Sequence, residues 1–89
     1  MTFAEKVIQF NARLQYTGLP LPQGIRIMNP FRESREAVRV SEEFYRKYYN
    51  DVNPRHLILG INPGRFGAGL TGVPFTDPKR LISECHIPY

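Results

Sequence analysis

The sequence has little cysteine and no long apolar run. Cys85 is the only cysteine, which excludes an intrachain disulfide and fits a reducing compartment. No apolar stretch approaches the roughly 20 residues that a membrane helix needs. The N-terminus also lacks the basic and then apolar pattern of a secretory signal. We therefore expect a cytoplasmic protein that does not contact a membrane.

No block of like charges and no low-complexity segment interrupts the 89 residues. Twelve Lys and Arg against eight Asp and Glu give a net charge of +4 that is spread along the chain. This distribution permits a polyanionic partner but does not require one. A composition of 42% hydrophobic and 22% charged residues is typical of a folded protein. The length allows one domain at most.

Three helices are predicted from capping residues and apolar spacing. Thr2 and Glu5 form a capping box at the start of the first helix. Its apolar face comprises Phe3, Val7, Phe10 and Leu14. A second helix is expected from about Glu33 to Tyr49, with an apolar face made of Ala37, Val40, Phe44 and Tyr48. A third begins with Asp77 as its cap and Pro78 at the first helical position. Its expected buried side comprises Leu81, Ile82 and Cys85.

The run from His56 to Ile61 is apolar and lies between turn signals. Its length predicts a strand buried on both faces, as in a parallel sheet. Such a strand needs neighbours, and parallel neighbours need crossover connections that this chain does not contain. We therefore expect residues 1–89 to be the N-terminal part of a larger α/β domain. Missing strands supplied by a partner chain are the alternative.

The segment Gly60–Pro78, which we call the glycine-rich loop, holds five of the seven glycines and three of the eight prolines. Glycine permits close backbone approach to a ligand, and proline stiffens the chain. A Walker phosphate loop is excluded because no Lys-Ser/Thr pair follows the last glycine. Residues 67–72 match G-x-G-x-x-G, but they neither follow a strand directly nor open a helix at once, so a dinucleotide site is only weakly indicated.

A nucleobase pocket fits this loop better. Asn62 follows the predicted strand, where its carboxamide is able to orient a water by accepting a hydrogen but is unable to ionise. Phe75 offers a flat face for an unstacked base. Backbone amides between Gly64 and Ala68 are available to a carbonyl oxygen. A nucleotide- or nucleobase-binding module without hydrolysis remains an alternative, as does a decayed, truncated protein.

Residues 60–64, 66–67 and 71–75 closely resemble the first motif of the single-strand-selective monofunctional uracil-DNA glycosylases. That family reads Gly-Met-Asn-Pro-Gly-Pro-Phe-Gly, three variable residues, and then Thr-Gly-Val-Pro-Phe, which matches without a gap. The whole chain looks like the N-terminal portion of a related bacterial branch. The resemblance implies a three-layer α/β/α fold with a mainly parallel sheet. It also implies hydrolysis of the N-glycosidic bond of uracil, or of a 5-substituted uracil, flipped out of DNA, without metal or cofactor.

The resemblance also implies roles for individual residues. Asn62 is expected to orient the attacking water, and Phe75 to stack on the uracil. Gly64 stands where some relatives carry a bulky aromatic, which implies a pocket open to 5-substituted bases. Backbone at Ile61, Gly67 and Ala68 is expected to meet the base or its water shell.

Departures from the family pattern limit what is expected of the chain alone. Arg65 replaces a proline, and either contacts DNA or is a solvated loop residue. The histidine that supports the departing uracil in the family has no counterpart, because His56 is expected at the opposite end of the predicted strand from Asn62 and His86 is expected on the last helix. Those histidines and Cys85 do not have zinc spacing. We therefore expect no metal, and a chain that is inactive by itself.

Overall fold

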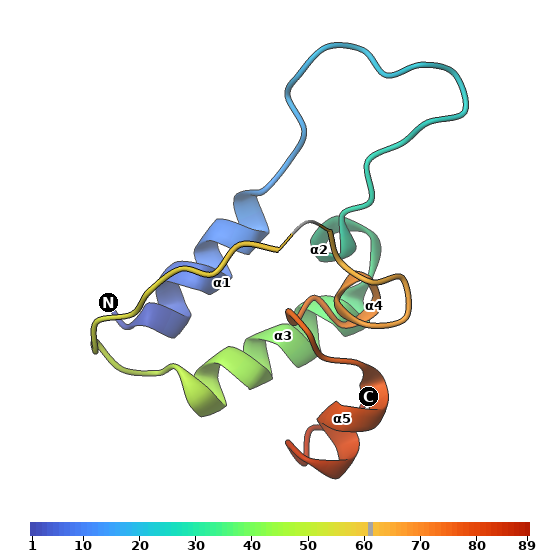
Figure 1. Ribbon diagram of the computed structural model, residues 1–89. Coiled ribbons are helices and arrows are strands. Elements are labelled where there is room, and N and C mark those ends of the chain that lie inside the picture. Colours follow the sequence, from blue (N-terminus) through green and yellow to red (C-terminus); the bar gives the residue numbers. More distant parts are fainter. Residues whose placement is uncertain (61) are drawn as a thin grey trace.

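The computed structural model describes residues 1–60 and 62–89. The helices within these residues are α1 (Phe3–Arg13), α2 (Pro30–Glu33), α3 (Arg35–Tyr48), α4 (Ala68–Thr71) and α5 (Pro78–Ser83). Helices α1 and α3 pack together, and the short helices α2 and α4 pack near one end of α3 (Figure 1). The segment between α1 and α2 leaves this body as a long loop. None of the helices in the described part of the chain is long and apolar enough to cross a membrane.

The capping box predicted for α1 is confirmed. The Thr2 hydroxyl accepts a hydrogen bond from the Glu5 amide at 3.2 Å, and the Glu5 carboxylate accepts one from the Thr2 amide at 3.4 Å. The predicted apolar face is half-buried at Phe3 and Val7, near this end of the helix, where the neighbouring Ala4 is fully buried. Phe10 and Leu14 are 64% and 41% exposed, because the chain after α1 turns away and leaves the far end of the helix uncovered (Figure 1).

The helix predicted from about Glu33 to Tyr49 is confirmed as α3 (Arg35–Tyr48), and the four-residue helix α2, which was not predicted, precedes it. Ser34 lies between them in an extended conformation (φ −138°, ψ 115°), and its hydroxyl accepts a hydrogen bond from the Ala37 amide at 3.1 Å. A side-chain cap of this kind starts a new helix and breaks the preceding one. Asn29 caps α2 by accepting from the Phe31 amide at 3.1 Å.

The hydrophobic core joins α3 to the end of the chain. Val40, Val73 and Leu81 are fully buried, and Ile87 is nearly so. Burying one such side chain stabilises the fold by about 1.5–3 kcal/mol. The core therefore fixes Val73, and with it the second half of the glycine-rich loop, against α3.

Helix α5 has the predicted start. The Asp77 carboxylate accepts a hydrogen bond from the Arg80 amide at 2.8 Å, and Pro78 is the first helical residue. Of the three residues expected on the buried side of α5, Leu81 is fully buried, Cys85 is half-buried and Ile82 is 53% exposed. The helix ends at Ser83, so His86, expected on it, lies beyond it in a left-handed conformation (φ 56°).

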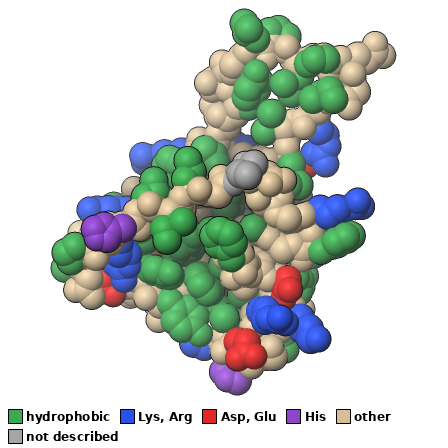
Figure 2. Space-filling model, viewed as in Figure 1, with side chains coloured by type: hydrophobic (Ala, Val, Ile, Leu, Met, Phe, Trp, Pro, Cys, Tyr) green, Lys and Arg blue, Asp and Glu red, His purple; other side chains and the backbone are tan. Residues whose placement is uncertain are grey.

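Residues 52–60 run extended past α1 without forming a strand (Figure 1). Leu57, Ile58 and Leu59, predicted to be buried on both faces, are 87%, 83% and 87% exposed. The physical reason is that no neighbouring strand is present among the described residues to pair with this backbone. Figure 2 shows hydrophobic side chains gathered on this face of the molecule. The three-layer α/β/α fold with a mainly parallel sheet stays a prediction.

Candidate active site

The glycine-rich loop is folded back on itself, and contains the short helix α4 that the sequence did not predict. The Gly64 carbonyl accepts hydrogen bonds from the amides of Gly67 at 3.1 Å and Gly69 at 2.8 Å. A Cβ on Gly69 would lie only 2.9 Å from that carbonyl, so this turn requires glycine. The Gly67 amide, expected to face a ligand, is therefore used within the loop. Ala68 is the first residue of α4, where the amide has no partner inside the helix.

Gly72 ends α4 in a left-handed conformation, with φ +72°. A Cβ here would lie 2.8 Å from the Phe31 ring and 3.4 Å from the Ala37 carbonyl oxygen. Only glycine allows α4 to pack this closely on α2 and α3. The next residue, Val73, is buried in the core with Val40 of α3.

Thr71 is the centre of the loop's hydrogen bonding. Its side chain is fully buried, and the hydroxyl accepts from the Val73 amide at 3.1 Å. The same oxygen lies 2.9 Å from the Thr76 carbonyl oxygen, 3.2 Å from that of Gly67 and 3.4 Å from that of Val73. The sequence reasoning gave Thr71 no role. The signal was present in its position between two glycines, where a small hydroxyl side chain bonds readily to nearby backbone.

Phe75 has an unusual backbone and an exposed ring. Its φ is +59°, a left-handed value that costs a non-glycine residue about 1–2 kcal/mol. The ring is 85% exposed, and its tip would lie 3.6 Å from a Cβ placed on Gly60. The fold therefore brings Phe75 back to the segment that leads into Asn62. An exposed aromatic face beside this segment is available for stacking.

The other predicted site residues lie around this loop. Asn62 and Gly64 are exposed, whereas Gly67 and Ala68 are half-buried. Ile61, predicted to contribute backbone contacts, lies outside the described residues. Arg65 is exposed, with its guanidinium carbon 4.8 Å from the centre of the Phe66 ring, and Phe66 is itself 71% exposed. This cation–π pair keeps a positive charge at the outer turn of the loop.

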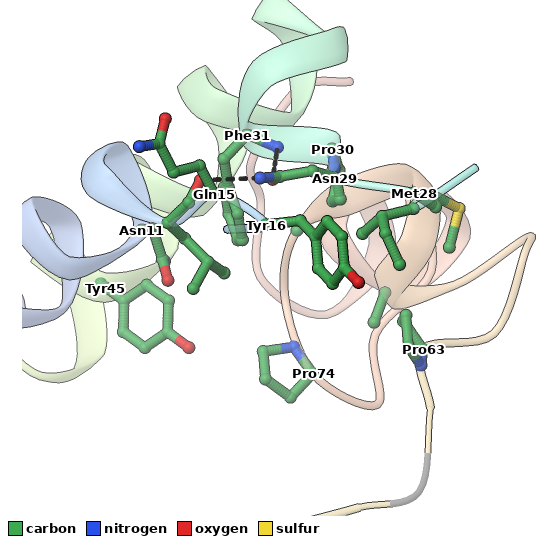
Figure 3. Close-up of a pocket in the computed structure, with 14 residues that line it drawn as sticks. Asn11, Gln15, Tyr16, Met28, Asn29, Pro30, Phe31, Tyr45, Pro63 and Pro74 are labelled. Carbon is green, nitrogen blue, oxygen red and sulfur yellow. Dashed lines mark hydrogen bonds between the residues drawn. The ribbon is translucent and has the colours of Figure 1, made fainter. Parts of the chain in front are cut away.

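A cavity of about 510 Å³ adjoins the loop on the side of the helices (Figure 3). Pro63, Ala68, Gly72 and Pro74 line it from the loop, but neither Asn62 nor Phe75 does. The remaining lining residues come from α1, α2, α3 and the connection between α1 and α2: Asn11, Leu14, Gln15, Tyr16, Ile27, Met28, Asn29, Pro30, Phe31 and Tyr45. The cavity is therefore distinct from the predicted base-stacking face.

The polar groups of this cavity are partly committed to the fold. The Asn29 side chain donates to the Leu14 carbonyl at 2.8 Å while it caps α2, as the dashed lines in Figure 3 show. Burial, with a smaller effect from Tyr49, raises the pKa of the Tyr45 phenol. The Asn29 side chain therefore has a structural role at this cavity.

No group of three or more His, Cys, Asp or Glu side chains able to hold a metal forms in the described ranges 1–60 and 62–89. His56 is exposed and lies within the extended segment 52–60, six residues before Asn62 in the sequence. His86 lies beyond α5. The chemistry in the described residues therefore consists of an exposed carboxamide, an exposed aromatic ring and a nearby cation.

Comparisons with known proteins agree with the motif. Residues 46–85 match the model of the uracil DNA glycosylase superfamily. Over 75 residues the chain is 38% identical to the single-strand selective monofunctional uracil-DNA glycosylases of Rattus norvegicus and Mus musculus, with 84% of this chain and 25% of each relative covered. All of this chain aligns with 38% of the chain in the crystal structure of Pedobacter heparinus SMUG2, at 70% identity and a TM-score of 0.93. The resemblance predicted from the sequence is therefore confirmed, and the chain spans about a quarter of the length of these curated relatives.

Proposed function

We propose that this chain, as a relative of the uracil-DNA glycosylase superfamily, supplies one half of the active site of a DNA repair glycosylase. The reaction is hydrolysis of the N-glycosidic bond of uracil, or of a 5-substituted uracil, flipped out of DNA. The observation that carries this proposal is the return of the exposed Phe75 ring to Gly60, two residues before Asn62. The match of the whole chain to part of a solved SMUG2 structure supports it.

The two main residues act at different places on the substrate. Phe75 stacks on the extruded base, an interaction worth about 1–3 kcal/mol. Asn62 accepts a hydrogen from the attacking water and orients its lone pair toward the sugar carbon from which the base departs. Because a carboxamide does not ionise, Asn62 positions the water without removing a full proton.

Gly64 sets the range of bases in this proposal. Its exposed position has space for a side chain, because a Cβ would lie 3.9 Å from the nearest atom, the Gly67 nitrogen. A hydrogen at this position leaves room for a substituent on carbon 5 of the uracil ring. The variant Gly64→Tyr is therefore expected to reduce cleavage of 5-hydroxymethyluracil more than cleavage of uracil. Equal losses on both substrates would contradict this role.

The other half of the site is proposed to come from a sheet and a leaving-group donor outside this chain. Exposed Leu57, Ile58 and Leu59 have the apolar character of a central strand, which supports an α/β/α fold in the complete protein. No histidine of the described residues lies beside Asn62 and Phe75. Because stabilisation of the departing anion is often the largest catalytic contribution, we propose that residues 1–89 alone are inactive.

Asn62→Ala in the full-length gene product tests the function. Cleavage of a uracil-containing oligonucleotide is expected to fall about 10²–10³-fold, the usual effect of removing one preorganised polar group. A matched control is Asn53→Ala, which changes an exposed carboxamide near the start of the extended segment and is expected to leave the rate unchanged. Loss of cleavage without loss of oligonucleotide affinity supports a hydrolase. Absence of cleavage by the unsubstituted protein, with retained affinity for uracil, would instead support a binding module.

Arg65 is proposed to contact a DNA phosphate. Its exposed position at the outer turn of the loop, beside Phe66, is the supporting observation. Arg65→Ala is expected to weaken binding uniformly across sequences. It is also expected to reduce the slope of log Kd against log salt concentration by about one, the contribution of one phosphate contact. Arg35→Ala, at the first residue of α3, is the matched control, and an equal effect of both variants would contradict the assignment.

A further inference from the structure

The hydroxyl of Thr71 holds the two sides of the turn that carries Phe75. It accepts a hydrogen bond from the Val73 amide at 3.1 Å, before the turn. Its single proton has its shortest acceptor in the Thr76 carbonyl oxygen at 2.9 Å, after the turn. Only Pro74 and Phe75 lie between these two residues. The hydroxyl therefore bridges Val73 and Thr76, and its hydrogen bonds close a short turn of backbone that contains Phe75.

These hydrogen bonds explain how Phe75 keeps its left-handed backbone conformation. A non-glycine residue at φ +59° persists only where surrounding contacts determine its conformation. Pro74 has a fixed φ, and the Thr76 amide donates to the Val73 carbonyl at 3.3 Å. The aromatic ring itself is 85% exposed, so packing of the ring does not impose the conformation. The backbone bonds centred on Thr71 do.

We infer that Thr71 is a positioning residue for base recognition, which rests on the proposed glycosylase function. The buried hydroxyl fixes the direction of the Phe75 ring and so presets the stacking surface before the base arrives. Its 3.2 Å approach to the Gly67 carbonyl couples this surface to the first turn of α4. Thr71 does not itself touch the substrate, because its side chain is fully buried.

The test is a double-mutant cycle in the full-length gene product, read by single-turnover cleavage of a uracil oligonucleotide. Thr71→Val keeps the shape of the side chain and removes the hydroxyl, whereas Thr71→Ser keeps the hydroxyl. We expect T71V to raise the substrate concentration for half-maximal rate at least tenfold. We expect T71S to remain within about threefold of the unsubstituted protein. Because Thr71 acts through Phe75, T71V is expected to change this half-maximal concentration less than about twofold when Phe75 is already alanine.

Two outcomes overturn this inference. One is a rise in the half-maximal substrate concentration on T71V that is equally large in the F75A background, which indicates a general structural role. The other is T71V activity equal to that of the unsubstituted protein. Ser41→Ala is the matched control, because Ser41 is also a buried hydroxyl (4% exposed) that bonds to a carbonyl, that of Val38, at 3.1 Å. It is expected to leave the half-maximal concentration unchanged.

A structural readout keeps the inference testable if T71V folds poorly. Thr71→Ala is then compared with T71S by NMR of the Phe75 backbone. Loss of the left-handed conformation is expected in the alanine variant only, and its retention there would overturn the inference. Absence of cleavage by the unsubstituted protein would refute the proposed function and this role with it. That result is distinguishable from a failure of Thr71 alone, which appears only in the variants.

Discussion

The ring of Phe75 lies against the backbone at Gly60, so that a Cβ at Gly60 would be 3.6 Å from the tip of the ring. A methyl group at Gly60 would therefore make an ordinary van der Waals contact with the ring. A branched side chain there would extend further and collide with it. The approach of the ring to Gly60 brings together the two ends of the motif that begins at residue 60 and ends at residue 75.

Substitutions at Gly60 should therefore divide by size. Gly60→Ala is expected to keep kcat/KM of the full-length protein within about twofold, as for a change of about 0.5 kcal/mol. Gly60→Val is expected to displace the Phe75 ring and lower kcat/KM about tenfold, or about 1.4 kcal/mol. Steady-state cleavage of a uracil oligonucleotide measures both. Equal activity of the two variants would show that the space at Gly60 does not determine the position of the Phe75 ring.

The backbone of Phe75 predicts a trade-off between stability and activity. Phe75→Gly removes the left-handed strain together with the ring, whereas Phe75→Ala removes the ring and keeps the strain. Because the ring is 85% exposed, its loss costs little burial. The free energy of unfolding of the glycine variant should exceed that of the alanine variant by about 1–2 kcal/mol. Urea denaturation measures the difference, and both variants should lose cleavage. A glycine variant no more stable than the alanine variant would contradict strain at this position.

Helix starts were predictable from the sequence because capping is local. The box formed by Thr2 and Glu5, and the cap of Asp77 before Pro78, each depend on residues within three positions of one another. The start of α3 at its Ser34 cap is also local, and the predicted start at about Glu33 lies within two residues of it. Helix α2 was missed because its four residues are too few to show an apolar period.

Burial and loop conformation were less accessible to sequence reasoning. The run of Leu57 to Leu59 indicates a buried strand, but burial depends on neighbours that the pattern does not specify. For the site, the motif identified Asn62 and Phe75 as residue types suited to a base pocket. It gave no indication of the left-handed Phe75 backbone or of the hydrogen bonds to Thr71, because these depend on how α4 packs against α2 and α3.

The close packing of Gly72 can be separated from its backbone strain. Gly72→Ala is expected to combine the left-handed cost of about 1–2 kcal/mol with a clash against the Phe31 ring, typically about 1–3 kcal/mol. Gly24→Ala is the matched control, because Gly24 also has a positive φ (+83°) but nothing lies within 4 Å of the position of its added Cβ. Urea denaturation should show Gly72→Ala to be the less stable by about the clash cost. Equal destabilisation by the two variants would mean that the Phe31 ring moves aside freely.

The pair of Asp51 and Arg55 predicts how stability changes in acid. The Asp51 carboxylate accepts hydrogen bonds from Arg55 at 2.7 and 2.9 Å, and the same guanidinium lies 4.8 Å from the ring centres of Phe3 and Tyr49. The hydrogen bond from Arg55 and that from the Asn53 amide hold the pKa of Asp51 below its ordinary 3.8. A carboxyl whose pKa is lowered by folding stabilises the protein above its unfolded pKa, and that contribution is lost as the pH falls toward the folded value.

Asp51→Asn should therefore lower Tm at pH 7 and reduce the further fall of Tm as the pH is taken below about 4. Glu33→Gln provides the matched comparison. The pKa of Glu33 is also lowered, chiefly by its hydrogen bond from the Asn29 amide, but this carboxylate lies at α2, away from the aromatic pair around Arg55. Thermal melts of the variants between pH 7 and pH 3 make the measurement. Because Arg55 bridges the start of α1 and the end of α3 through Phe3 and Tyr49, D51N should also loosen the packing of those rings. An acid profile for D51N parallel to that of the unsubstituted protein would show that Asp51 titrates alike in the folded and unfolded states, so that its bonds to Arg55 do not stabilise the fold.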